Sequence, residues 1–354
     1  MLEPYNNNKL LTLTKIRDNI LNDFFDNKLH HSIMFVGNKG LGKATLAYHI
    51  ANKILDDETS LKKNKTTSLF GEEINSDDLD INNPTFNLIK NKKHPDLLVI
   101  EKEVDSKTSK LDKEIKVASA RKIIDFMSLA PFISKNKVII IDAIDEMNIS
   151  AQNAILKSLE EPNKNTYIFL ICHNINNILD TINSRCKKIN IQKHGFDDWK
   201  NIFKNSYIEE FKKLNEEKLL ELYNLSNSSL SSAIDIIEND GLFLYNYIEN
   251  TLSQKSLNIE ELHNLATKLN DNEKLFLLFK DFILLFLYKV LQYFSINQID
   301  EVFKTKNLEF LLKNNEGSII EKIKFTKNIL RDIEIYNLNK KHAVIVLFNK
   351  LFTF

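Results

Sequence analysis

The sequence has few cysteines and no excess of charge, and both facts limit its chemistry. Only Cys172 and Cys186 occur among 354 residues. Two thiols cannot form a four-cysteine zinc site or a disulfide framework, so we expect a reduced protein of the cytoplasm. Lys and Arg number 48, and Asp and Glu also number 48. A net charge of zero argues against a protein that grips nucleic acid alone, but leaves open DNA contact through a local patch or as one member of a ring.

Long apolar runs are also absent. The most membrane-like stretch, residues 282–288, is closely flanked by Lys280, Asp281 and Lys289. A membrane-spanning helix needs about 20 apolar residues, so a buried helix is the better interpretation of this stretch. Residues 1–8 are polar and lack the apolar region of a signal peptide. We therefore expect no membrane partner.

Strand and helix patterns alternate through the first half of the chain. Expected strands lie at 32–36, 96–100, 137–141, 167–172 and 188–191, and expected helices at 10–25, 43–55, 117–129, 150–159 and 178–184. This alternation is typical of an α/β fold with a parallel sheet covered by helices on both faces. Residues 56–93 interrupt it and predict a polar insertion.

After about residue 194 only helical patterns remain. They include 216–224, 230–237, 274–293 and 319–335. A chain of this length exceeds one ordinary core. We expect three domains, at 1–193, 194–240 and 241–354, and the boundary near 240 is marked only by an Asn-Asp-Gly turn.

Glycine is scarce, with 7 in the chain, yet Gly37, Gly40 and Gly42 fall within six residues. They lie in a G-x-x-x-x-G-K motif that follows an expected strand and leads into an expected helix. In this arrangement backbone N–H groups converge on phosphate, and Lys43 reaches the β- and γ-phosphates. A complete motif has Ser or Thr next, where the hydroxyl binds Mg²⁺, but Ala44 carries only a methyl group. A tight turn that binds nothing remains an alternative.

Two further positions complete the candidate cofactor-binding set. Thr45 follows Ala44 but faces another direction on the helix, so it is a poor substitute for the missing hydroxyl. Asp142 ends the most strand-like run, where P-loop NTPases place a carboxylate that helps hold Mg²⁺; the alternative is a residue that caps the next turn. Ala143 stands where many such ATPases place the Glu that polarises water. Asp145 and Glu146 follow, and we interpret them as solvated charges.

Three further motifs follow the phosphate loop in order. They are His94-Pro95-Asp96, the run from Asn153 to Pro162 (NAILKSLEEP), and Ser184-Arg185-Cys186. Over residues 10–191 the chain thereby resembles the AAA+ clamp-loader subunits of bacterial DNA polymerase III. The second motif is similar to the family pattern at every position except Ile155.

This resemblance implies roles for particular residues. Arg185 would act in trans as an arginine finger on the γ-phosphate bound by an adjacent ATPase subunit, because a guanidinium is always charged and presents a planar fork of donors; the alternative is an ordinary surface ion pair. Ser232 stands where the family's nucleotide-sensing arginine would be. His173 lies near the family's sensing threonine, and the alternative is a plain loop histidine. The family's zinc module would fall within 56–93, which has no cysteine, so no zinc is expected.

The resemblance also implies an architecture and partners. Residues 1–193 would be an AAA+ P-loop domain, 194–240 a small helical lid, and 241–354 a helical oligomerisation collar. Losses at Ala44, Ala143 and Ser232 favour a non-hydrolysing subunit of the hetero-oligomeric polymerase III holoenzyme. No cofactor would be required, and ATP or ADP binding stays open. The partners would be the motor subunit, a delta-type wrench subunit, the sliding clamp and primer–template DNA. The alternative is an active AAA+ ATPase that uses Thr45 and Glu146.

Overall fold

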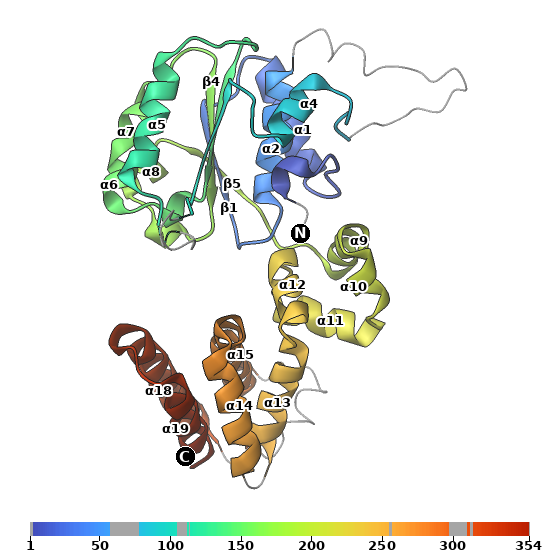
Figure 1. Ribbon diagram of the computed structural model, residues 1–354, viewed down its shortest axis with the longest axis vertical. Coiled ribbons are helices and arrows are strands. Elements are labelled where there is room, and N and C mark those ends of the chain that lie inside the picture. Colours follow the sequence, from blue (N-terminus) through green and yellow to red (C-terminus); the bar gives the residue numbers. More distant parts are fainter. Residues whose placement is uncertain are drawn as a thin grey trace, which may run out of the picture. The chain divides into compact units, whose positions relative to one another are not determined.

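The computed structural model describes residues 3–56, 78–104, 112, 114–254, 257–296, 310–311 and 314–353 (Figure 1). The chain divides into two compact units. The first comprises Met1–Phe211 with Ser228–Leu230, and the second comprises Lys212–Asn227 with Ser231–Phe354. The three domains expected from the sequence, with boundaries after residues 193 and 240, stay a prediction.

A parallel sheet of five strands forms the centre of the first unit, in the order β2-β3-β4-β1-β5. Its strands are β1 (Ser32–Val36), β2 (Leu97–Glu101), β3 (Lys137–Asp142), β4 (Thr166–Cys172) and β5 (Lys187–Asn190). The central strands have apolar interiors and carry polar residues only at their ends. This is the pattern of parallel strands that helices cover on both faces. The predicted α/β architecture is confirmed.

Alternate residues of each central strand enter two separate cores. Ile33 and Phe35 face one core, and Met34, between them, faces the other. The first core is covered by α1 (Thr14–Phe25), α2 (Lys43–Leu55) and α4 (Pro84–Lys90). The second is covered by α5 (Val117–Ser128), α6 (Ile149–Ala154), α7 (Leu156–Glu160) and α8 (Asp180–Asn183), and Figure 1 shows the two groups of helices on opposite sides of the sheet.

Short elements complete this unit. They are the 3-10 turns η1 (Pro4–Asn6), η2 (Ile144–Glu146) and η3 (Ile175–Asn177), and the helices α9 (Phe196–Ser206) and α10 (Ile208–Lys212), of which α10 extends to the boundary of the second unit. The single helix expected at 150–159 is two helices, because the chain breaks at Ile155, which caps both α6 and α7.

The predicted polar insertion at 56–93 is wrong for its later part. Residues 57–77 lie outside the described residues. Helix α4 forms beyond them because Pro84 occupies its first turn and the Asn83 side chain accepts a hydrogen bond from the Thr85 backbone N–H. Phe86 and Ile89 are both 2% exposed. This segment therefore forms a helix that contributes apolar side chains to the interior.

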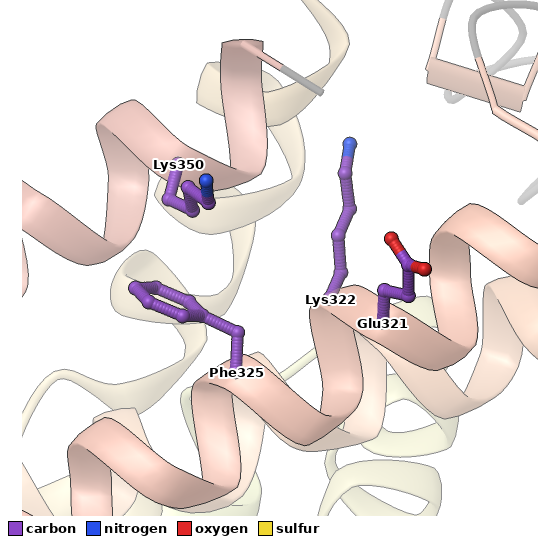
Figure 2. Close-up of a pocket in the computed structure, with 4 residues that line it drawn as sticks. All are labelled: Glu321, Lys322, Phe325 and Lys350. Atoms are coloured by element: carbon purple, nitrogen blue, oxygen red, sulfur yellow. The ribbon is translucent and has the colours of Figure 1, made fainter.

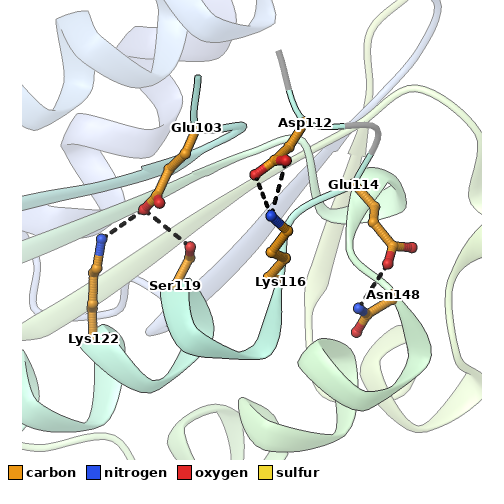
Figure 3. A network of polar contacts seen from close by, with 7 residues as sticks. All are labelled: Glu103, Asp112, Glu114, Lys116, Ser119, Lys122 and Asn148. Carbon is orange, nitrogen blue, oxygen red and sulfur yellow. Dashed lines mark hydrogen bonds and ion pairs between the residues drawn. The ribbon is translucent and has the colours of Figure 1, made fainter. Parts of the chain in front are cut away.

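A polar network fixes the chain around α5 (Figure 3). Glu103 accepts hydrogen bonds from Lys122 Nζ at 2.6 Å and from Ser119 Oγ at 3.2 Å. The same close-up contains two further pairs, Lys116 with Asp112 and Asn148 with Glu114. The contacts of Glu103 and Asp112 connect the segment before α5 to the helix and its N-cap, and the Glu114 contact connects the same segment to the N-cap of α6.

The second unit is entirely helical in its described residues. Its helices are α11 (Glu216–Leu225), α12 (Leu230–Glu238), α13 (Gly241–Ser253), α14 (Ile259–Asp271), α15 (Glu273–Ile296), α18 (Glu316–Tyr336) and α19 (Lys340–Thr353). The first residue of α12, Leu230, is assigned to the first unit. Phe279, Phe282 and Phe286 of α15 are buried, which confirms the buried helix expected at 282–288. Within the described part of the chain, no helix combines the length and apolar character that crossing a membrane requires.

Candidate functional site

The glycines of the phosphate loop meet geometric demands between β1 and α2. A Cβ added at Gly37 would lie 2.6 Å from the backbone oxygen of Ile191, which no ordinary side chain tolerates. Gly40 and Gly42 have φ values of +80° and +81°, and Gly42 is the N-cap of α2. Because L-residues with side chains rarely adopt this left-handed conformation, glycine is required for the loop to close onto the helix.

Lys43 turns back onto its own loop. Its side-chain Nζ donates hydrogen bonds to the backbone oxygens of Gly37, at 2.7 Å, and Asn38, at 2.5 Å. The residue is 3% exposed. Burial lowers the pKa of Lys43 to about 8, although attraction to Asp142 opposes the change. The ammonium group is thus satisfied by loop carbonyls within the chain itself.

Asp142 lies at the carboxyl end of β3, level with Glu101 at the end of β2. Burial raises the pKa of Asp142 to about 6, and the negative charges of Glu101 and Glu146 act in the same direction, while Lys43 opposes them. Asp142 is level with Ile171 of β4, and Val36, which precedes the phosphate loop, is level with Cys172 of the same strand, so the sheet brings Asp142 and the phosphate loop to one end.

Asp145 and Glu146 are not the solvated charges expected from the sequence. The Asp145 carboxylate accepts hydrogen bonds from the backbone N–H groups of His173, at 2.8 Å, and Asn174, at 3.0 Å. Glu146 forms an ion pair with Lys102 at 3.0 Å. The expectation was wrong because the chain beyond β4 returns to the end of β3 and supplies donors there.

His173 belongs to the same region. Burial lowers its pKa to about 4, and the positive charge of Lys43 acts in the same direction. The imidazole is therefore neutral at pH 7. The carboxyl end of the sheet thus brings together a carboxylate, a neutral imidazole and an ammonium group that is already bonded to loop carbonyls.

The two alanines singled out by the sequence are part of the packed interior. Ala143 is 2% exposed and belongs to the core beneath α2, and Ala44 packs against the same core. Thr45 is half-buried in the first turn of α2. Ser232 lies in α12 of the second unit, and its proposed equivalence to a sensing arginine stays a prediction.

Arg185 lies at the amino end of the parallel strands, opposite the carboxyl end where the phosphate loop and Asp142 lie. It follows α8 and precedes β5, whose first residue, Lys187, is level with Ile33 of β1. The phosphate loop begins after Val36, at the other end of the same register. Three residues of strand separate these levels by about 10 Å. The guanidinium is partly exposed and pairs with the carboxylate of Glu160.

Asp96 of the His-Pro-Asp motif holds the loop before β3. Its carboxylate accepts three backbone hydrogen bonds, from Phe132 at 2.6 Å, Ile133 at 2.7 Å and Ser134 at 2.8 Å. The Phe132 side chain is 84% exposed on this loop, whereas Asp96 is 1% exposed. Asp96 therefore fixes the backbone of a loop with exposed apolar side chains. The sequence of the motif gave no indication of this role.

A pocket also lies in the second unit, apart from every predicted site residue. It is lined by Glu321, Lys322, Phe325 and Lys350, between α18 and α19 (Figure 2). Lys322 Nζ already donates to Asn314 Oδ1 and to the backbone oxygen of Leu351, both at 2.7 Å. Over the residues that the structure describes, no group of three or more His, Cys, Asp or Glu is arranged to hold a metal ion.

The sheet order, the phosphate loop between β1 and α2, and the acidic residue that ends β3 define a P-loop fold of the AAA+ class. The family described as "DNA polymerase III, delta subunit" matches residues 13–195. The chain belongs to this DNA polymerase III subunit family. The match confirms the resemblance to clamp-loader subunits of DNA polymerase III that the motifs indicated.

Individual relatives agree with the family. The chain is 31% identical to the DNA polymerase III subunit delta' of Pseudomonas aeruginosa over 156 residues, which cover 44% of this chain and 41% of that protein. It is 29% identical to the subunit gamma of Buchnera aphidicola subsp. Schizaphis graminum over 238 residues, which cover 66% of this chain and 58% of that protein. The chain thus spans about half the length of the curated relatives it matches.

Among solved structures, the chain is similar to a DNA polymerase III gamma-subunit-related protein from Thermotoga maritima. The TM-score is 0.43 and the identity 18%, and the match covers 97% of this chain and 99% of the other.

Proposed function

We propose that this chain is a non-hydrolysing clamp-loader subunit of DNA replication, which supplies Arg185 in trans to the ATP of a neighbouring subunit and helps to load the sliding clamp on primed DNA. Membership of the DNA polymerase III family supports the setting. The finer role rests on the placement of the site residues.

The position of Arg185 carries the proposal. An arginine finger must reach a γ-phosphate, but the chain's own phosphate loop lies at the other end of the sheet. The Arg185 guanidinium lies at the end of the sheet opposite this loop and is partly exposed, so it is available to a phosphate on another subunit. A planar, permanently charged fork suits this task because transition-state charge spreads over the phosphoryl oxygens.

The state of the phosphate loop supports the absence of hydrolysis. Ala44 and Ala143 place methyl groups where a metal ligand and a base would be needed, and both methyls contribute to the core. Glu146, the alternative base, is held by Lys102. Lys43 is satisfied by loop carbonyls. We therefore propose that no cofactor is required, that ATP or ADP binding at this loop would be passive, and that no zinc is bound.

The proposed partners follow from the same role. A finger in trans requires an adjacent motor subunit with its own ATP. We further propose that the assembled ring contains a delta-type wrench subunit, contacts the sliding clamp and encloses primer–template DNA. The net charge of zero fits a shared DNA site better than one built by this chain alone.

ATP turnover tests this function. The isolated chain should show no Mg²⁺-dependent hydrolysis above the level of a Lys43→Ala variant. In the reconstituted complex, Arg185→Ala should preserve assembly and lower DNA-stimulated turnover at least about tenfold, since arginine fingers contribute roughly 10³–10⁵ in rate. Arg121→Ala, an exposed arginine on α5, is the matched control. Hydrolysis by the isolated chain that Lys43→Ala abolishes would instead favour an active ATPase.

A further inference from the structure

The Arg185 guanidinium is held on one side by its own chain. Nη1 donates to the backbone oxygen of Thr181 at 2.8 Å and to Ser184 Oγ at 3.3 Å, and Nη2 contacts a carboxylate oxygen of Glu160. A guanidinium has five N–H donors. Among the described residues three of them are engaged, so two remain, which is the number that a bidentate contact with phosphate uses.

The backbone on both sides of this pair is fixed by the core. Leu159, which precedes Glu160, is 1% exposed, and Cys186, which follows Arg185, is 8% exposed, and both belong to the core beneath α5. The imidazole of His31 also bonds the Leu159 carbonyl oxygen, at 2.9 Å. The two Cα positions are therefore set by packing, and Glu160 supplies the carboxylate among the groups that hold the flexible arginine side chain.

Stability does not explain the pair. The side chains of Arg185 and Glu160 are 33% and 44% exposed. Ion pairs this accessible contribute little to folding, because water screens the attraction and the two long side chains lose conformational freedom. The consequence of the contact is orientation, and a small misplacement of a reacting group can reduce a rate by about 10².

We propose that Glu160 is a positioning residue that holds the Arg185 guanidinium in the orientation it presents to the phosphate of a neighbouring subunit. This inference rests on the proposed role of Arg185 in trans. It also assigns distinct roles to two adjacent exposed carboxylates, because Glu160 pairs with the arginine, whereas Glu161, the C-cap of α7, forms no ion pair with it in the described part of the chain.

A double-mutant cycle in the reconstituted complex tests the proposal. Glu160→Gln should lower kcat for DNA-stimulated ATP hydrolysis about three- to tenfold with KM for ATP unchanged, because the neutral amide attracts the guanidinium less strongly. Glu160→Ala should lower kcat further, by up to about 10². In an Arg185→Ala background, Glu160→Gln should have no additional effect. Glu161→Gln is the matched control and should leave kcat unchanged.

The outcomes separate the two claims. Slow turnover by Arg185→Ala together with unchanged or faster turnover by Glu160→Gln would overturn the positioning role and leave the finger in place. The same would follow if Glu160→Gln slowed the Arg185→Ala complex as much as it slows the wild type. Wild-type turnover by Arg185→Ala would overturn the proposed function and this inference with it. Thermal unfolding of the isolated Glu160 variants, expected to match the wild type, excludes a folding defect.

Discussion

Replacing Asp96 by asparagine should destabilise the first unit more than any surface substitution of the same kind. The 1% exposed carboxylate accepts backbone hydrogen bonds from Phe132, Ile133 and Ser134. Hydrogen bonds to a buried charged group are each worth about 1.5–3 kcal/mol. Asparagine offers one carbonyl oxygen and turns an NH2 group towards the remaining donors. It also removes the negative charge that attracts the buried Lys137 ammonium. We expect a loss of about 2–4 kcal/mol.

Urea unfolding followed by the midpoint is a suitable assay, with amide hydrogen exchange as a local readout. The N–H groups of the three loop residues should exchange faster in Asp96→Asn, while those of the central strands keep their order of protection. Asp125→Asn, at an exposed position of α5, should change neither quantity. A loss below about 0.5 kcal/mol with the loop amides still protected would refute the reasoning, because it would mean that the carboxylate bonds are replaceable by an amide or by water.

Two further changes test the phosphate-loop region. Gly37→Ala should lower the free energy of unfolding by about 1–3 kcal/mol, because its Cβ would overlap the Ile191 backbone oxygen, whereas Gly195→Ala, with no atom within 4 Å, should be nearly neutral in thermal denaturation. Asp142 has a pKa raised from 3.8 to about 6, so the folded state binds the extra proton and stability falls as pH rises through this range. Asp142→Asn should therefore stabilise the protein by about 1–3 kcal/mol above pH 6, and the gain should vanish towards pH 4; an equal gain at both values would contradict the assignment.

Much of the first unit could be predicted from sequence. The strand at Ser32–Val36 and the helix at Lys43–Leu55 have the predicted bounds, because an unbroken apolar run and a helical repeat meet at a glycine-rich turn. The same reasoning failed at 78–93, where a few apolar residues among many polar ones were enough for burial of Phe86 and Ile89. Such sparse apolar positions give no clear signal until the surface that covers them is known.

The sequence by itself determined the local chemistry of the candidate site. It supplied the three glycines that a tight loop requires, the lysine that follows them, and the methyl groups of Ala44 and Ala143. Only the tertiary structure decided which groups meet, because parallel strands join residues far apart in the chain. It brought Asp145 to the backbone of His173 and placed Glu160 against Arg185. It also set Arg185 at the end of the strands opposite Lys43. Local sequence carries no record of such distances, since they depend on strand order and register.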